Sequence, residues 1–166
     1  MADMDWSRFA VRINVKAPAR ELYRCWATRA GIESWFLRRA DYKKANGEAR
    51  TDEEAVEKGD SYQWYWYGYG DDTTESGEIL ECDGADLFRF SFGKAGICTV
   101  RLYEEEGEQL VELVQEEIPV DEKGKQYYHV GCKTGWTFYL ANLKSILEGG
   151  IDLRNKNEKL RRMLNA

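Results

Sequence analysis

The sequence predicts an α+β fold in which a curved antiparallel β-sheet wraps around one long C-terminal helix, with two short helices after the first strand. Three observations support this prediction. Residues 135–150 carry apolar side chains at the i, i+3, i+4, i+7 spacing of an amphipathic helix. Short alternating segments separated by turn residues fill the middle of the chain. Pro18 and Gly31 delimit two short helical segments directly after the first alternating segment.

The first predicted strand covers residues 9–16, where apolar and polar side chains alternate as on a half-buried strand. A helix is expected to begin at Pro18, because proline favours the first turn of a helix, and to continue over residues 21–28. Gly31 breaks this helix, and the apolar side chains within residues 32–36 predict a second short helix. The chain thus inserts two short helices before the sheet continues.

The remaining strands follow from further alternating segments, with a polar loop at residues 46–58. They are expected at 37–42, 62–69, 75–82, 87–92, 97–103 and 110–118. Within 62–69, alternation predicts one face made by Tyr62, Trp64 and Trp66, and a solvent-facing side made by Tyr65, Tyr67 and Tyr69. In the strand at 87–92, one face is made by Phe88, Phe90 and Phe92. The Asp83-Gly84 pair between the two strands at 75–92 indicates a hairpin turn.

The predicted terminal helix presents one apolar face to the sheet. This face consists of Trp136, Tyr139, Leu140, Leu143, Ile146 and Leu147. Asn142 and Lys144 are expected on its other sides, and Gly149-Gly150 ends the helix because glycine accepts a left-handed backbone without penalty. Residues 119–125 form a polar connection before the helix.

Residues 152–164 are polar, but they carry four apolar side chains at near-helical spacing, Leu153, Leu160, Met163 and Leu164. This pattern predicts a short helical tail that either packs back on the domain or forms an oligomer contact. We therefore divide the chain into a domain at residues 1–150 and a C-terminal tail at residues 151–166.

Composition narrows the classes of partner. A chain of 166 residues suits one domain, and its net charge of -6 argues against nucleic acid or an anionic membrane as main partner. No apolar run approaches the ~20 residues that span a bilayer. Four separated cysteines without a C-x-x-C pair or secretory signal indicate reduced thiols in a cytoplasmic protein. No metal or cofactor motif is present, so no metal or cofactor is expected.

Several short motifs together resemble the START-like (SRPBCC, helix-grip) superfamily, in the branch of the activators of heat-shock-protein-90 ATPase. The motifs are VKAPARELYRCW (Val15–Trp26), GIESWF (Gly31–Phe36), GEILECD (Gly77–Asp83), LFRFSF (Leu87–Phe92) and GWTFYLANLKSILEGGIDLR (Gly135–Arg154). Their order and spacing cover most of residues 9–154.

The resemblance implies a cavity between the terminal helix and the sheet, which members often use for apolar ligands, with the two short helices capping its mouth. It also implies a chaperone as an alternative partner, since the eukaryotic activators bind that chaperone directly. Many relatives carry a histidine near the end of the last strand. Gln115 is the nearest candidate here, which removes a simple proposal for a catalytic acid or base.

The expected ligand site is an aromatic set facing this cavity. Its ten members are Trp35, Phe36, Tyr62, Trp64, Trp66, Phe88, Phe90, Phe92, Trp136 and Tyr139. Such rings suit a small hydrophobic molecule, a lipid or an aromatic metabolite. The competing interpretation is a dense aromatic core that leaves no cavity.

Three functions remain open from the sequence. The first is non-catalytic binding of a small hydrophobic ligand, the second is a chaperone regulator, and the third is a cyclase- or hydrolase-like activity inside the cavity. The sole histidine, His129, lacks an identifiable catalytic partner and is expected at a helix start or in a loop. No catalytic residue is assigned, and both a monomer and a homodimer are compatible with the sequence.

Overall fold

A seven-stranded antiparallel sheet forms the frame of the fold, in the order β1-β7-β6-β5-β4-β3-β2. The computed structural model describes residues 3–164. The strands are β1 (Phe9–Asn14), β2 (Arg39–Lys43), β3 (Ser61–Tyr65), β4 (Thr74–Cys82), β5 (Leu87–Ser91), β6 (Ile97–Glu105) and β7 (Glu108–Glu116). Consecutive strands from β2 to β7 are neighbours, so the predicted series of antiparallel strands is confirmed.

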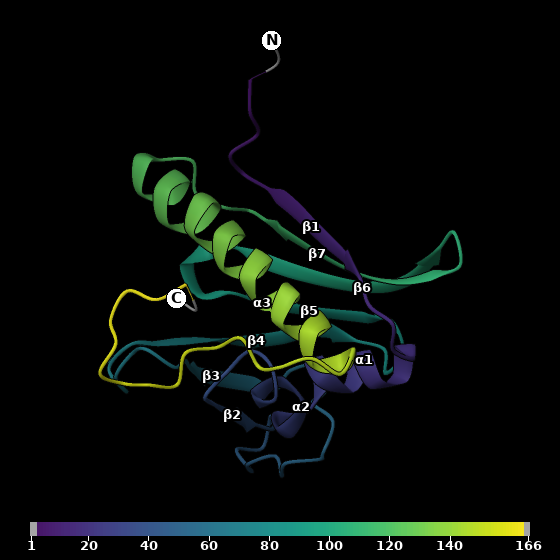
Figure 1. The fold of residues 1–166 in the computed structure, drawn as a ribbon. Helices are drawn as coiled ribbons and strands as arrows, with labels where there is room; N and C mark the ends of the chain where they lie inside the picture. Colours follow the sequence, from purple (N-terminus) through teal and green to yellow (C-terminus); the bar gives the residue numbers. More distant parts are fainter. Residues whose placement is uncertain (1–2, 165–166) are drawn as a thin grey trace.

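Helices cover one face of this sheet. They are α1 (Ala19–Ala27), α2 (Arg29–Glu33) and α3 (Gly131–Leu147), with a 3₁₀ turn η1 (Gly93–Ala95) and a π-helix η2 (Gly124–Val130). Figure 1 shows α3 crossing the sheet diagonally, with α1 and α2 near its C-terminal end. The two short helices carry the chain from β1 at one edge of the sheet to β2 at the other. The predicted fold class is therefore confirmed.

The alternation of the strands produces one inner face that packs against α3. Phe90 pairs with Ile79 on β4 and with Cys98 on β6, and all three side chains are fully buried. Directly opposite residues of antiparallel strands share a face, so these pairs extend one apolar surface across the sheet. The aromatic side chains between this surface and α3 form a continuous core.

The apolar face of α3 lies where the helical periodicity predicts it. Trp136, Tyr139, Leu140 and Leu143 are buried against the sheet. The helix begins four residues earlier than predicted, because η2 leads into it without a break. It ends before Gly149, whose φ of 81° is the left-handed conformation that glycine favours.

Asn142 lies in the interior of the protein, against the prediction that it faces solvent. Its side chain is fully buried and donates to the carbonyl oxygen of Trp35 at 2.8 Å and to Asp152 Oδ1 at 3.1 Å. Its own amide oxygen accepts from the backbone N–H of Leu153 at 2.7 Å. Asn142 is buried because it satisfies backbone groups of two segments that pack beside α3.

The strand predicted at 62–69 is shorter than the alternation suggests. β3 ends at Tyr65, and Gly68 then adopts a φ of 87° in the turn that follows. Tyr65 is buried rather than solvent-facing, because the guanidinium group of Arg39 lies 3.8 Å from its ring centroid. Arg39 thus covers a ring that the alternation alone assigns to water.

The predicted helical tail is wrong for the described residues 151–164, which contain no helix. Figure 1 shows this segment, in yellow, running back along the side of the sheet formed by β2, β3 and β4. Extended backbone allows Arg154 to reach the turn after α2, where its guanidinium donates to the carbonyl oxygens of Glu33, Ser34 and Leu37 at 3.0 Å each. A helical turn here would withdraw Arg154 from these acceptors.

Asp152 holds Arg154 in this position. Asp152 Oδ2 accepts from Arg154 Nη2 at 2.8 Å and forms an ion pair with Lys156 at 3.0 Å. Burial raises the pKa of Asp152, but the hydrogen bonds from Arg154 and Lys156 outweigh burial and lower the pKa below its ordinary 3.8. Stabilisation by Asp152 is therefore present above pH 3.8 and is lost as the pH falls toward the lowered value.

Replacement Asp152→Asn is expected to lower the free energy of unfolding at pH 7 and to have a smaller effect at pH 3. At pH 3 the wild-type carboxylate is partly protonated in the unfolded chain, so less of its contribution remains to be lost. Urea unfolding of both proteins at the two pH values measures this difference. An effect of equal size at pH 3 and pH 7 would contradict the role of the charged carboxylate.

Candidate functional site

An apolar groove with a volume of about 490 Å³ opens between the start of α3 and the β4–β5 region of the sheet. It is lined by Phe36, Trp66, Tyr69, Thr73, Glu75, Phe92, Ala95, Tyr127, Tyr128, Gly131, Cys132, Gly135, Trp136 and Tyr139. We refer to these residues as the aromatic groove. Its lining is predominantly apolar, which is the usual character of a small-molecule site.

Two features of η2 and α3 open the groove. Gly131 and Gly135 present no side chain to it, so the helix leaves free space on this side. The π-helix η2 places Tyr127 and Tyr128 at its rim, and Tyr127 is 58% exposed. Short π-helical segments frequently accompany functional sites. The groove therefore depends on the local geometry at the junction of η2 and α3.

Buried hydrogen bonds fix the floor of the groove. Gln115 is fully buried on β7, and its Oε1 accepts from the indole N–H of Trp136 at 3.0 Å. The amide nitrogen of Gln115 donates to the carbonyl oxygen of Ala95 at 2.9 Å. Gln115 thereby joins the sheet, η1 and α3 through groups that lack access to water, and Trp136 has a defined orientation under the groove.

Five residues of the predicted aromatic set line the groove. They are Phe36, Trp66, Phe92, Trp136 and Tyr139. The Phe36 ring lies with its centroid 4.8 Å from Trp136 and 4.9 Å from Tyr139, so it sits at the centre of this group. Phe36 is 97% buried within the turn after α2, which makes it part of the inner wall.

The other five predicted residues pack in the interior and do not border the groove. They are Trp35, Tyr62, Trp64, Phe88 and Phe90. Trp35 is fully buried and its indole N–H donates to the carbonyl oxygen of Cys25 at 2.9 Å. Tyr62 stacks on Trp64 with ring centroids 4.0 Å apart, and its hydroxyl donates to the carbonyl oxygen of Ser91. A filled aromatic core and an open groove thus coexist, at different ends of the sheet.

Several groove residues were not predicted from the sequence. The pattern of η2 gave no signal, because a π-helix follows an i→i+5 spacing that the 3.6-residue period does not detect. Tyr69 lies beyond the end of β3, outside the alternation that assigned it to solvent. Glu75 could have been found, since the prediction of a strand over 75–82 places it on the same face as Ile79.

Titratable groups in the groove favour binding over nucleophilic chemistry. Burial raises the pKa of the Cys132 thiol, which keeps it protonated and a poor nucleophile. Burial also raises the pKa of the Glu75 carboxyl group, more than the nearby Lys94 lowers it. The groove therefore offers one partly desolvated carboxyl group among aromatic rings.

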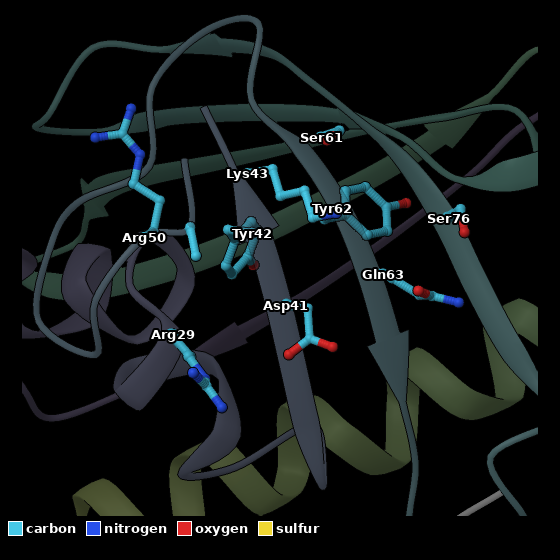
Figure 2. Close-up of a pocket in the computed structure, with 10 residues that line it drawn as sticks. Arg29, Asp41, Tyr42, Lys43, Arg50, Ser61, Tyr62, Gln63 and Ser76 are labelled. Atoms are coloured by element: carbon cyan, nitrogen blue, oxygen red, sulfur yellow. The ribbon is translucent and has the colours of Figure 1, made fainter. Parts of the chain in front are cut away.

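A second opening, of about 370 Å³, lies over β2 and β3 and is lined mostly by charged and polar residues. Figure 2 shows that charged and polar side chains surround it, including Arg29, Asp41 and Arg50. The charges of Arg29, Asp41 and Arg50 are already paired with neighbouring side chains. Arg50 forms a buried ion pair with Asp60 at 2.7 Å, and Arg29 pairs with Glu33 at 3.2 Å. We therefore regard the aromatic groove as the candidate site.

His129 is part of η2 rather than of a catalytic arrangement. It is 99% buried, and its Nδ1 lies 3.0 Å from the carbonyl oxygen of Trp6. The rings of Trp6 and Phe9 meet its imidazole edge-on. His129 therefore connects the segment before β1 to η2. Its position where η2 leads into α3 agrees with the predicted helix start.

Between residues 3 and 164, no cluster of three or more potential metal ligands occurs. No helix in the same range combines the length and apolar character that a membrane span requires.

The fold is similar to several solved structures. The protein SSP2350 from Staphylococcus saprophyticus aligns with a TM-score of 0.68 at 20% identity, covering 89% of this chain and 96% of that one. The Aha1 dimer from Colwellia psychrerythraea aligns with a TM-score of 0.64 at 14% identity, covering 86% of this chain and 97% of that one. DynU16, a protein in the dynemicin biosynthetic locus, aligns with a TM-score of 0.63 at 21% identity, covering 90% of this chain and 50% of DynU16. These similarities support the fold.

No curated protein matches the sequence. The family model described as "Activator of Hsp90 ATPase homolog 1-like protein" matches residues 16–148. This range begins just after β1 and ends just after α3, so it includes the strands β2 to β7 and every residue that lines the groove. The chain therefore belongs to the family of activator of Hsp90 ATPase homolog 1-like proteins.

Proposed function

We propose that this protein binds a small aromatic or otherwise hydrophobic molecule in the aromatic groove, without transforming it. The observation that carries the proposal is the groove itself, an opening of about 490 Å³ walled mainly by aromatic rings and open to solvent beside α3. Half of the residues that the sequence suggests as ligand-binding lie along it. The raised pKa of Cys132 disfavours covalent catalysis there.

Desolvation of the ligand supplies the driving force. Burial of an aromatic body of 150–250 Å² contributes about 4–6 kcal/mol before the cost of immobilising the ligand. Trp66 and Phe92 flank the opening, while Phe36 and Trp136 form its interior wall. This arrangement allows a flat ligand to contact rings on more than one side.

Replacement Gly131→Phe is expected to abolish binding while the protein remains folded. Gly131 has helical φ and ψ of -62° and -49°, and an added Cβ would meet only the carbonyl oxygen of Gln126 at an ordinary 3.6 Å. A larger side chain at this position therefore occupies the groove instead of disturbing the core. Fluorescence titration with 9-methylanthracene, an uncharged aromatic probe, measures the loss.

The matched control is Gly131→Ala, which adds only a methyl group and is expected to raise the melting temperature slightly through helix propensity. It should retain binding within about threefold. Equal binding by wild type, the alanine variant and the phenylalanine variant would show that the probe binds elsewhere. Absence of saturable binding to the wild type by a broad panel of lipids and aromatic compounds would overturn the proposed function.

A second candidate function is regulation of the Hsp90 chaperone by direct protein contact, which the matched family model supports by its description. This function requires no ligand in the groove. Addition of the purified protein to Hsp90 would then raise the chaperone's ATPase rate, and Gly131→Phe would leave that stimulation unchanged. An unchanged ATPase rate with the wild-type protein would argue against this function.

A further inference from the structure

Glu75 occupies an unusual place on the inner face of the sheet. It lies directly opposite Trp64 in the β3–β4 register, and opposite residues of antiparallel strands share a face. Trp64 is fully buried in the core, so this shared face is the one that packs against the helices. Among the paired inner-face residues of the described strands that are at least partly buried, Glu75 alone carries a charge.

The carboxyl group of Glu75 is incompletely compensated. Its Oε1 accepts from the backbone N–H of Ser76 at 3.0 Å. No lysine or arginine of residues 3–164 lies within 4.0 Å of its carboxyl oxygens. The ionisable groups that face it are Lys94 after β5, Tyr62 on β3 and Cys132 on α3. A partly desolvated carboxylate of this kind gains from a cationic partner.

The backbone beside Glu75 leaves room for this carboxyl group. Gly93 has a φ of 49°, and a Cβ built on it would lie 1.9 Å from Glu75 Oε1. Any side chain at position 93 would therefore displace the carboxyl group from its place at the groove. Because Gly93 has no side chain, the carboxyl group of Glu75 can occupy this space beside the aromatic rings of the groove.

We propose that the aromatic groove selects ligands that join an aromatic body to a basic amine, with the ammonium group bound by Glu75. The inference rests on the proposed function, since it assigns a ligand class to the same groove. An ammonium ion would form a charge-assisted hydrogen bond with the carboxylate, and the neighbouring electron-rich rings of Trp66 and Tyr69 add cation–π attraction. An anionic ligand of the same shape would meet repulsion instead.

The test compares, at pH 7, three probes that share the three-ring anthracene body and differ in charge. They are the cation 9-(aminomethyl)anthracene, the uncharged 9-methylanthracene and the anion 9-anthracenecarboxylate. Fluorescence titration is carried out with wild type, Glu75→Gln and Glu78→Gln. Glutamine preserves the size of the side chain and removes its charge. Glu78 lies on the same strand, is exposed and does not line the groove, which makes its replacement a matched control.

Wild type is expected to bind the amine at least tenfold more tightly than the uncharged probe and to bind the carboxylate most weakly. Glu75→Gln should remove the preference for the amine and leave affinity for 9-methylanthracene within about twofold. Glu78→Gln should behave as wild type. A further variant, Gly93→Ala, should weaken amine binding selectively by displacing the carboxyl group.

Equal affinity of wild type for the amine and the uncharged probe would overturn this inference while leaving the proposed function intact. The same holds for an amine preference that survives Glu75→Gln. Failure of all three probes to bind would overturn the amine-selective groove, and the wider panel of hydrophobic compounds then decides the proposed function separately. Thermal melts of each variant establish that the proteins compared are folded.

Discussion

Replacement of Trp136 by alanine is expected to lower the free energy of unfolding by about 3–5 kcal/mol, the range for removal of a large buried aromatic side chain. Trp136 is 98% buried on α3 and its ring lies within 6.3 Å of Trp26, Phe36, Phe90 and Phe92, measured between centroids. The substitution also removes the N–H that Gln115 Oε1 accepts. Urea unfolding monitored by circular dichroism measures the loss.

The variant Trp136→Phe separates packing from hydrogen bonding. It keeps an aromatic ring against Phe36 and loses the indole N–H. The amide oxygen of Gln115 then keeps only the weak Cys98 thiol donor, so an intermediate destabilisation of about 1–3 kcal/mol is expected. A control on the exposed side of α3, Lys133→Ala, should change stability by less than about 0.5 kcal/mol. Equal stability of Trp136→Ala and this control would contradict the position assigned to the α3 face.

The second large effect is expected at Arg154. Its replacement by alanine should lower the free energy of unfolding by about 3–5 kcal/mol, as for removal of one member of a buried ion pair. The side chain of Arg154 is only 2% exposed and binds Asp152 together with three backbone carbonyl oxygens after α2. Its loss leaves these acceptors without their donor and frees the segment after α3. Chemical denaturation and limited proteolysis of residues 151–164 both report the change.

Lys156→Ala is the matched control, because Lys156 contacts the same carboxylate but is 51% exposed. This substitution should lower the free energy of unfolding by less than about 1 kcal/mol, as is typical of exposed ion pairs. Arg154→Lys should not restore stability, since one ammonium group cannot reproduce the planar fork of donors. Equal effects of Arg154→Ala and Lys156→Ala would contradict the anchoring role of Arg154.

The frame of the fold was predictable because its strands and its long helix obey simple periods. Phe88 and Phe90 alternate with polar residues on β5, and Trp136, Tyr139 and Leu143 recur at helical spacing on α3. Both patterns arise from one-sided burial, which local sequence records directly. The match of the family model to residues 16–148 agrees with the resemblance carried by these segments.

The details of the groove and the tail depend on contacts between distant segments, which periodicity does not record. Asn142 is buried because its side chain forms hydrogen bonds with the backbone of Trp35 and Leu153. Tyr65 is buried beneath the guanidinium group of Arg39. The tail is extended because Arg154 has acceptors in the turn after α2. Each case is a polar group whose partner lies far away in the sequence.

The measurement that most directly tests the aromatic groove as a ligand site is a two-dimensional ¹H–¹⁵N NMR titration that follows the six tryptophan indole N–H signals. Trp66 and Trp136 line the groove, whereas Trp26 and Trp35 are fully buried and do not line it. With 9-(aminomethyl)anthracene or another ligand that binds the protein, the signals of Trp66 and Trp136 should shift progressively and saturably. The signals of Trp26 and Trp35 should move little. Saturable binding that shifts other signals and leaves those of Trp66 and Trp136 in place would contradict the proposed site.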